Sequence, residues 1–287
     1  MRNIKLTIEY DGTNYNGWQD QQSRTPGCRV DGHSGTRTRL LTIQGVLREA
    51  LERITQADVS LIGAGRTDAG VHAQGQVAHF HTVSDLPVER FPFAINAQVP
   101  RDIVVRSAEE VAPEFNARRD ATAREYRYVI YSHKFRTAVM RLYSYHVPFS
   151  LDADAMAEAA GYFTGVHDFS GFTCTTGRGR GTTGDDQDVP GQESDDREEG
   201  VSDLRYNPSM KKIMKLDIEK KDDFFYITVK ANSFLMHMVR YMVAALLEVG
   251  KREMNPGDIK LYLEPGLKKW THSRAPARGL CLMRVEY

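Results

Sequence analysis

The stretch Gly63-Ala64-Gly65-Arg66-Thr67-Asp68-Ala69-Gly70-Val71-His72-Ala73 contains the densest local signal in the chain. It is a glycine-flanked loop between an apolar run at 59–64 and a β-rich segment at 76–82. Glycines let the backbone bend close to a ligand, while Arg66 and Asp68 supply a cation and a carboxylate two positions apart. From the spacing alone, an Asx turn with a surface ion pair is the slightly favoured interpretation, because Asp and Gly fill turns in most proteins.

Strands and helices alternate on both sides of this loop. Apolar alternation over residues 4–10 predicts an opening strand, and residues 103–108 are again rich in β-formers. Apolar residues at helical spacing over 43–54 predict a helix that Thr42 is placed to cap, and residues 92–99 could form a short helix.

The second half of the chain uses the same elements. Its predicted strands lie at 124–131, 213–218, 224–231 and 280–286, and its predicted helices at 152–163 and from about 234 to 250. We therefore expect an α+β protein with mixed sheets in two parts. The pattern breaks between 111 and 122, so the expected domains are residues 1–120 and residues 121–287.

Charge is distributed unevenly along the chain. Its 287 residues carry 38 basic and 38 acidic side chains, but residues 185–203 hold nine acids and a single base, Arg197. The remainder has 37 bases against 29 acids, a net charge of +8 that is compatible with a polyanionic partner. Residues 23–39 and 175–208 lack periodicity, and we expect both to be mobile surface insertions, the second disordered.

Composition excludes several classes of protein. Apolar content is 41% and charged content 26%, and the uncharged run at 241–247 is far too short to span a bilayer, which predicts a soluble globular protein. The first twenty residues lack a secretory apolar region, so a cytoplasmic location is expected. Three scattered cysteines argue against a disulfide framework and a structural zinc site. The pair His79-x-His81 is interpreted as ordinary strand residues, and Gly179-x-Gly181-x-x-Gly184 as a chance match to a dinucleotide fingerprint, since no strand precedes it.

Residues 65–73 strongly resemble the active-site signature of the TruA family of tRNA pseudouridine synthases. The resemblance covers nearly the whole chain apart from the two insertions. Further stretches resemble the family's other motifs in the same order: Tyr10-Asp11-Gly12-Thr13, Gly17-Trp18-Gln19, Thr42-Ile43-Gln44-Gly45, Phe115-Asn116-Ala117-Arg118, Ala121-Thr122-Ala123-Arg124-Glu125-Tyr126-Arg127-Tyr128, Ala231-Asn232-Ser233-Phe234 through Met238-Val239-Arg240, and Ala275-Pro276-Ala277-Arg278-Gly279-Leu280.

The resemblance implies a fold and an activity. The fold is α+β, with two pseudo-related α/β halves whose mixed, largely antiparallel sheets meet at a central active-site cleft. The activity is isomerisation of uridine to pseudouridine in the anticodon stem-loop of tRNA, at positions 38, 39 and 40, by a homodimer whose two subunits the tRNA bridges. The reaction breaks the bond from C1′ to N1 and joins C1′ to C5, so the resemblance implies neither a cofactor nor a metal ion.

The resemblance also assigns residues to the site. It implies a carboxylate nucleophile at Asp68, an Arg240 that pairs with it, a Tyr126 that stacks on the target base, and an Arg66 that helps extrude the nucleotide. Attack on the ribose, attack on the ring and assisted elimination remain open for Asp68. Without the family, Arg240 would be a helix-surface arginine, Arg66 an exposed charge, and Tyr126 and Tyr128 core residues of a strand.

A non-catalytic RNA-binding protein or RNA chaperone on the same fold is the alternative function. Retention of Asp68, Tyr126 and Arg240 together counts against it. The chain also departs from the family pattern, because the Trp18-Gln19 and Ile43-Gln44-Gly45 motifs usually lie closer together and the acidic insertion is unusual. These departures concern the range of substrates rather than the chemistry.

Overall fold

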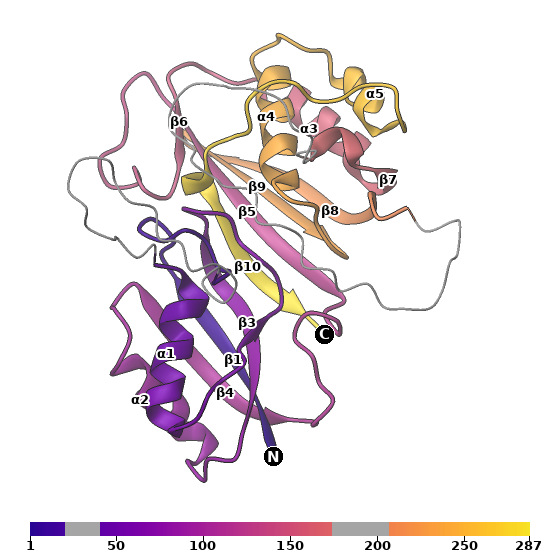
Figure 1. Cartoon of the computed structure of the whole chain (residues 1–287). Coiled ribbons are helices and arrows are strands. Elements are labelled where there is room, and N and C mark those ends of the chain that lie inside the picture. Colours follow the sequence, from indigo (N-terminus) through magenta and orange to yellow (C-terminus); the bar gives the residue numbers. More distant parts are fainter. Residues whose placement is uncertain (21–40, 174–206) are drawn as a thin grey trace, which may run out of the picture.

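The computed structural model describes residues 1–20, 41–173 and 207–287 (Figure 1). Within these ranges the elements follow one another in the order β1 (Arg2–Tyr10), α1 (Ile43–Thr55), β2 (Ile62–Gly63), β3 (His72–Thr82), η1 (Val88–Arg90), α2 (Phe91–Asn96), β4 (Ile103–Val111), β5 (Ala123–Ser132), β6 (Tyr145–Val147), α3 (Ala153–Phe163), β7 (Gly165–Asp168), η2 (Ser170–Phe172), β8 (Met210–Lys221), β9 (Phe224–Ala231), α4 (Met238–Gly250), η3 (Pro256–Ile259), α5 (Lys260–Leu263), η4 (Ala277–Gly279) and β10 (Leu280–Glu286).

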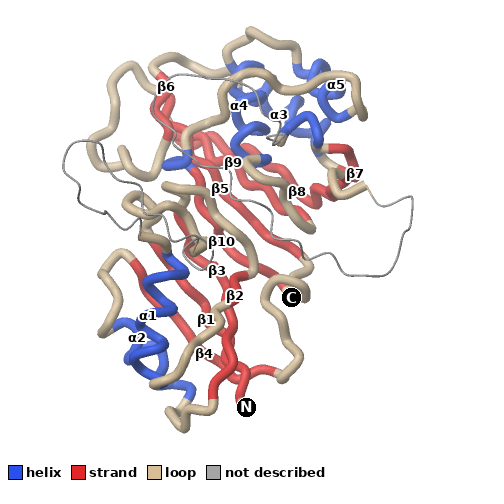
Figure 2. Tube along the Cα trace, viewed as in Figure 1, coloured by secondary structure: helices blue, strands red, loops and turns tan. Residues whose placement is uncertain are grey.

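The strands of the described residues form one ten-stranded mixed sheet (Figure 2). Its main path runs β4-β1-β3-β10-β5-β9-β8-β7, with β2 paired to β3 and β6 paired to β5. The β3–β10 and β5–β6 pairs are parallel, and the other pairs are antiparallel. The C-terminal strand β10 thus lies between the strands of the first part of the chain and those of the second, and it joins them into a single sheet.

Local sequence explains the elements that carry the site. The apolar residues of β1 alternate with polar ones, so that Ile4, Leu6 and Ile8 are buried on one face. Helix α1 begins after Thr42, whose side chain accepts a hydrogen bond from the Gly45 amide at 3.3 Å. These two elements match the sequence prediction.

Helices cover the sheet at both ends of the molecule. Figure 1 shows α1 and α2 beside the strands of the first part, and α3, α4 and α5 grouped beside β7, β8 and β9. Buried residues from both parts belong to one hydrophobic cluster, which reaches from Ile4 through Ile130 to Leu246. The predicted α+β class, with a mixed and mostly antiparallel sheet, is confirmed.

Two of the predicted elements differ clearly in the structure. The apolar run at 59–64 contributes only the two-residue strand β2. The last long helix begins at Met238 instead of near residue 234, because His237 has a positive φ of 60° that a continuous right-handed helix cannot contain. Residues 23–39, the glycine pattern at 179–184 and the acidic run at 185–203 lie outside the described residues.

Candidate active site

The loop that carries Asp68 is held against the end of β1 by backbone contacts. The Trp18 amide donates to the Thr67 carbonyl at 3.0 Å, and the Gly70 amide donates to the Tyr15 carbonyl at 3.2 Å. Gly17 has a φ of 77°, and a Cβ there would lie 2.4 Å from the Thr67 oxygen. Only glycine permits this close approach, so the Gly17-Trp18 motif positions the Asp68 loop.

The loop itself is a tight turn. The Val71 amide donates to the Asp68 carbonyl at 3.1 Å, and Gly70 adopts a φ of 75°. Beside it, the hydroxyls of Tyr10 and Thr67 share a hydrogen bond of 2.8 Å. Asp68 therefore lies on a fixed backbone immediately before β3, with its side chain 19% exposed.

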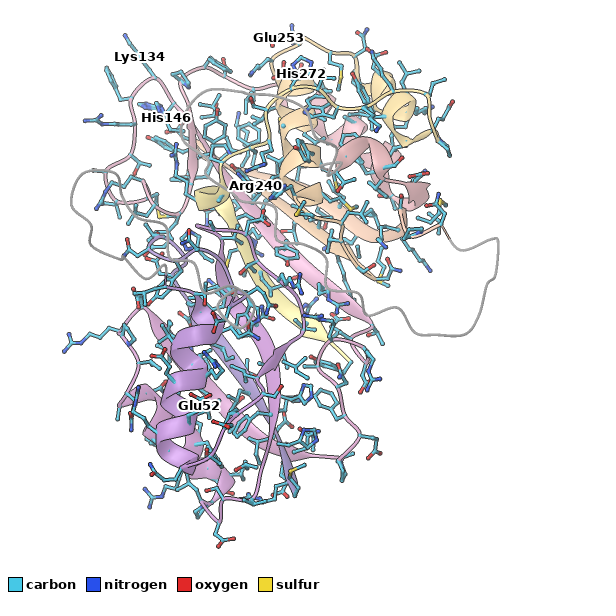
Figure 3. The ribbon with its side chains drawn as sticks, in the orientation of Figure 1. Glu52, Lys134, His146, Arg240, Glu253 and His272 are labelled. Atoms are coloured by element: carbon cyan, nitrogen blue, oxygen red, sulfur yellow. The ribbon has the colours of Figure 1, made fainter. Side chains whose placement is uncertain are left out.

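Arg240 reaches Asp68 from the first turn of α4. Its Nη1 donates to Asp68 Oδ2 at 3.1 Å, and its Nε donates to the Ala275 carbonyl at 2.7 Å. Figure 3 shows Arg240 in the middle of the molecule, far from surface residues such as Glu52. The Arg240 side chain is only 1% exposed, so it is not a helix-surface arginine. A buried guanidinium and the N-terminus of α4 thus both place positive charge beside the Asp68 carboxylate.

Tyr126 lies on β5, close enough to Asp68 for the charge of that carboxylate to act on its phenol. It is 8% exposed, and its ring meets the edge of Phe234 at 5.2 Å between centroids and 89° between planes. Burial, together with the negative charge of Asp68, raises the pKa of Tyr126 far above its ordinary value. The phenol is therefore protonated at neutral pH, and it offers a hydrogen-bond donor and an aromatic face.

Tyr128, two residues further along β5, has a different environment. Its hydroxyl donates to the Pro276 carbonyl at 2.8 Å, and its ring packs directly on Gly279, where a Cβ would lie 2.6 Å from the ring. Tyr128 is thus a packing residue, as its pattern alone suggested, whereas Tyr126 borders the carboxylate.

Arg66 is the exposed member of the predicted set. Its Nε donates to Gln19 Oε1 at 3.1 Å, and Gln19 Nε2 in turn donates to Gln44 Oε1 at 2.8 Å. The two glutamines come from separate motifs that the resemblance singled out. The structure thus brings Asp68, Tyr126 and Arg240 together. Arg66 lies on the exposed side of the loop that carries Asp68.

His237 is a site residue that the sequence prediction missed. Its Nε2 lies 3.6 Å from Asp68 Oδ1, and its side chain is only 7% exposed. The available signal was its spacing, because His237 stands three positions before Arg240 at the start of the same helix.

Other polar candidates have ordinary partners. His79 Nδ1 accepts a hydrogen bond from the Ala117 amide at 3.1 Å, and His81 Nε2 contacts the Pro113 carbonyl at 3.0 Å.

Across residues 1–20, 41–173 and 207–287, we find no group of three or more metal-ligating side chains placed to hold an ion. None of the helices in these ranges is long and apolar enough to cross a bilayer.

Comparison with known proteins places this site in a family. A family model described as tRNA pseudouridine synthase matches residues 6–119 and 197–287. The chain is 38% identical to tRNA pseudouridine synthase A of Caldicellulosiruptor saccharolyticus over 287 residues, and the alignment covers all of both proteins. It is 39% identical over 284 residues to the protein of the same name from Moorella thermoacetica, with 99% of each covered. The motifs around Asp68 and Arg240 fall within the ranges that the family model matches, and the motif around Tyr126 falls within both alignments. The chain therefore belongs to the tRNA pseudouridine synthases, a family of isomerases.

Proposed function

We propose that the protein isomerises uridine to pseudouridine at positions 38, 39 and 40 of the tRNA anticodon stem-loop, with Asp68 as the nucleophile. The observation that carries the proposal is the contact of 3.1 Å between Asp68 and the buried Arg240. The relatives bear the name tRNA pseudouridine synthase A, which supports tRNA as the substrate. The positions within the stem-loop rest on the family resemblance.

The reaction requires an ionised carboxylate and no redox chemistry. The bond from C1′ to N1 breaks, the uracil turns, and C1′ joins C5; a proton leaves C5 and N1 ends with a proton, so atoms and electrons balance without a cofactor. Arg240 donates a charge-assisted hydrogen bond to Asp68 Oδ2 at 3.1 Å, which pairs the carboxylate with a fixed positive charge. Attack on the ribose, attack on the ring and assisted elimination all use this same oxyanion.

Tyr126 and Arg66 act on the nucleotide rather than on the carboxylate. The Tyr126 ring offers a stacking face for a uracil that has left the RNA stack, and its protonated hydroxyl can donate to a base oxygen. Arg66 lies on the exposed side of the loop, where a guanidinium can contact phosphate or occupy the space that the extruded base leaves.

The larger assembly follows from the same family resemblance. We propose a cytoplasmic homodimer in which the tRNA bridges both subunits, each built from halves at residues 1–120 and 121–287. Family membership and the Asp68–Arg240 pair weigh against the alternative of a non-catalytic RNA-binding protein.

Positional mapping tests this proposal. Anticodon stem-loop RNAs that each carry a single uridine, at 38, 39 or 40 or at a loop position outside this set, are incubated with the protein and then probed chemically for pseudouridine. We expect product at the three named positions only. Product confined to another position, or an identical pseudouridine map in tRNA from cells with and without the protein, would overturn it.

A further inference from the structure

We propose that His237 is a positioning residue, which holds the Asp68 carboxylate so that its Oδ1 faces the nucleotide. The inference rests on the proposed role of Asp68 as the reacting carboxylate. In this role His237 takes part in no chemical step. It determines which oxygen of Asp68 faces the nucleotide and keeps that oxygen in place.

The two oxygens of Asp68 have different neighbours. Oδ2 accepts a hydrogen bond from the Arg240 guanidinium at 3.1 Å, which is a charge-assisted contact. Oδ1 lies 3.6 Å from His237 Nε2, just beyond hydrogen-bond range. Oδ2 is therefore the more tightly held oxygen, and Oδ1, with the longer contact, is the one that can turn to an incoming ribose or ring.

Arg274 determines which nitrogen of His237 carries the proton. Its Nη1 lies 3.5 Å from His237 Nδ1. A guanidinium only donates hydrogen bonds, so Nδ1 is the acceptor and the proton is on Nε2. In this tautomer the nitrogen that carries the proton is the one 3.6 Å from Asp68 Oδ1.

The backbone of His237 adopts an unusual conformation that places its side chain near Asp68. Its φ of 60° and ψ of 2° are left-handed, and its side chain makes no capping hydrogen bond to α4 although it occupies the N-cap position. A non-glycine residue in this region is strained, and such strain concentrates at functional sites. The ring is also fixed by an edge contact with Tyr241 at 6.4 Å between centroids.

One short segment therefore controls both carboxylate oxygens. His237 and Arg240 precede and open the same helix, so one segment positions both side chains at Asp68. Active-site hydrogen bonds are often long in the free protein and shorten when the substrate binds. A closed His237 contact would stop rotation of the carboxylate about its side-chain bonds while leaving one lone pair of Oδ1 for the nucleotide.

The test compares two replacements of His237 that differ in the donor. His237→Phe keeps a planar ring and removes the N–H, whereas His237→Gln restores an N–H donor on a flexible side chain. We expect His237→Phe to lower the single-turnover rate constant about 10²-fold, the usual effect of misplacing a reacting group by about 1 Å. Its Kd for tRNA should be unchanged, and His237→Gln should recover most of the rate.

Controls separate this role from folding and from the proposed function. His237→Gly, which accepts a positive φ without strain, replaces His237→Phe if that variant does not fold. His272→Phe alters an exposed histidine and should leave the rate unchanged. Wild-type protein that makes no pseudouridine would refute the proposed function. If the wild type is active, two results would overturn only the role of His237. One is a His237→Phe variant that reacts at the full rate, and the other is an equal loss of rate in folded His237→Phe and His237→Gln variants.

Discussion

Tyr126 contributes a ring and a hydroxyl, and substitution can separate the two. Tyr126→Phe should keep stacking and lose the hydroxyl, while Tyr126→Ala loses both. Stacking of a base on an aromatic ring is worth about 1–3 kcal/mol. We therefore expect tRNA to bind Tyr126→Ala less tightly than Tyr126→Phe by about that amount, as measured by filter binding at fixed salt.

Tyr128→Phe is the matched control on the same face of β5. It removes the hydrogen bond to the Pro276 carbonyl, and the expected effect is a loss of about 1 kcal/mol in the free energy of unfolding with tRNA affinity unchanged. Equal tRNA affinity and full turnover in both Tyr126 variants would make Tyr126 a core residue like Tyr128.

The sequence reveals some of these residues and conceals others. Asp68 stands in a dense glycine-flanked motif, so its loop was visible without any structure. Arg240 is 172 positions away, and no periodicity connects the two; only the family resemblance paired them. His237 escaped notice because a spacing of three residues, as between His237 and Arg240, is common in helices. Its left-handed backbone is also invisible in the pattern of apolar residues.

At the scale of elements, Arg124 connects the two segments that meet at the site. From β5, its Nη2 donates to the carbonyls of Ala64 and Arg118 at 2.7 and 2.9 Å. Its Nη1 donates to the carbonyls of Ala121 and Asn232 at 3.3 and 3.0 Å. Ala64 precedes the Asp68 loop and Asn232 begins the segment that leads to Arg240, so one guanidinium holds both.

Arg124→Met should therefore impair both stability and turnover. Four carbonyl groups would lose a charged donor, and we expect the free energy of unfolding to fall by about 3 kcal/mol or more. The single-turnover rate should also fall under conditions where the variant remains folded, because the Asp68 loop and the Arg240 segment lose their common anchor. Urea unfolding and rate measurements on the same samples check both effects.

Arg127→Met, three residues along the same strand, provides the comparison. Its Nε donates to the Thr228 hydroxyl at a marginal 3.4 Å, so its replacement should change little. Similar losses in the two variants would contradict a specific role for Arg124.

Element boundaries show the limit of sequence patterns in this fold. Helical spacing of apolar residues continues back to Leu235, yet α4 begins at Met238. The spacing shows which face of a helix is apolar, but it does not show that φ is positive at His237. The run at 59–64 is buried in part, but only Ile62 and Gly63 pair with β3. Burial was predictable from composition, whereas pairing depended on a partner strand distant in sequence.

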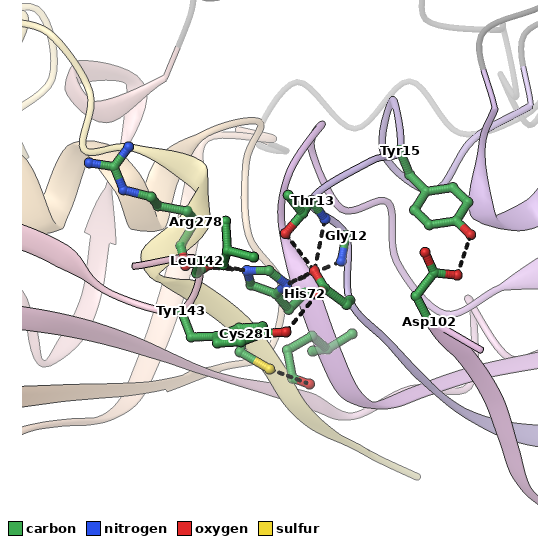
Figure 4. Close-up of polar contacts among 11 residues, drawn as sticks. Gly12, Thr13, Tyr15, His72, Asp102, Leu142, Tyr143, Arg278 and Cys281 are labelled. Carbon is green, nitrogen blue, oxygen red and sulfur yellow. Dashed lines mark hydrogen bonds and ion pairs between the residues drawn. The ribbon is translucent and has the colours of Figure 1, made fainter. Parts of the chain in front are cut away.

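At the scale of the whole molecule, few direct backbone contacts join the two parts of the sheet. The parallel β3–β10 ladder contains two residue pairs, Cys281 with His72 and Leu282 with Ala73. Side chains reinforce the junction, as Figure 4 shows. His72 Nε2 contacts the Leu142 carbonyl at 3.0 Å, and the Tyr143 hydroxyl donates to Asp11 Oδ2 at 2.7 Å.

The Tyr143 contact should make stability depend on pH. Burial tends to raise the pKa of Asp11, but hydrogen bonds from Thr13 and Tyr143 outweigh burial and lower it below its ordinary value. A carboxyl whose pKa is lower in the folded state stabilises the protein above its unfolded pKa of about 3.9, and this contribution is lost as the pH falls through the folded pKa.

Tyr143→Phe should accordingly lower the free energy of unfolding by about 1 kcal/mol at pH 7. The difference from wild type should shrink as Asp11 becomes protonated below about pH 4. Urea titrations of both proteins, from pH 7 down to the lowest pH at which both fold, measure the difference. A difference that stays constant with pH would show that the hydroxyl does not act through the Asp11 charge.

The proposed catalytic centre depends on this junction, since Asp68 comes from the first part of the chain and Tyr126 and Arg240 from the second. Within this centre, Asp68 is proposed as the reacting carboxylate. Asp68→Asn is nearly isosteric, so it should preserve the loop and tRNA binding while removing the anionic oxygen.

The most direct measurement is a single-turnover assay with Asp68→Asn in excess over anticodon stem-loop RNA, with the melting temperature and tRNA affinity of the same preparation determined in parallel. We expect a folded protein that binds tRNA about as tightly as wild type and forms no detectable pseudouridine. Product formation by Asp68→Asn at the wild-type rate would contradict it.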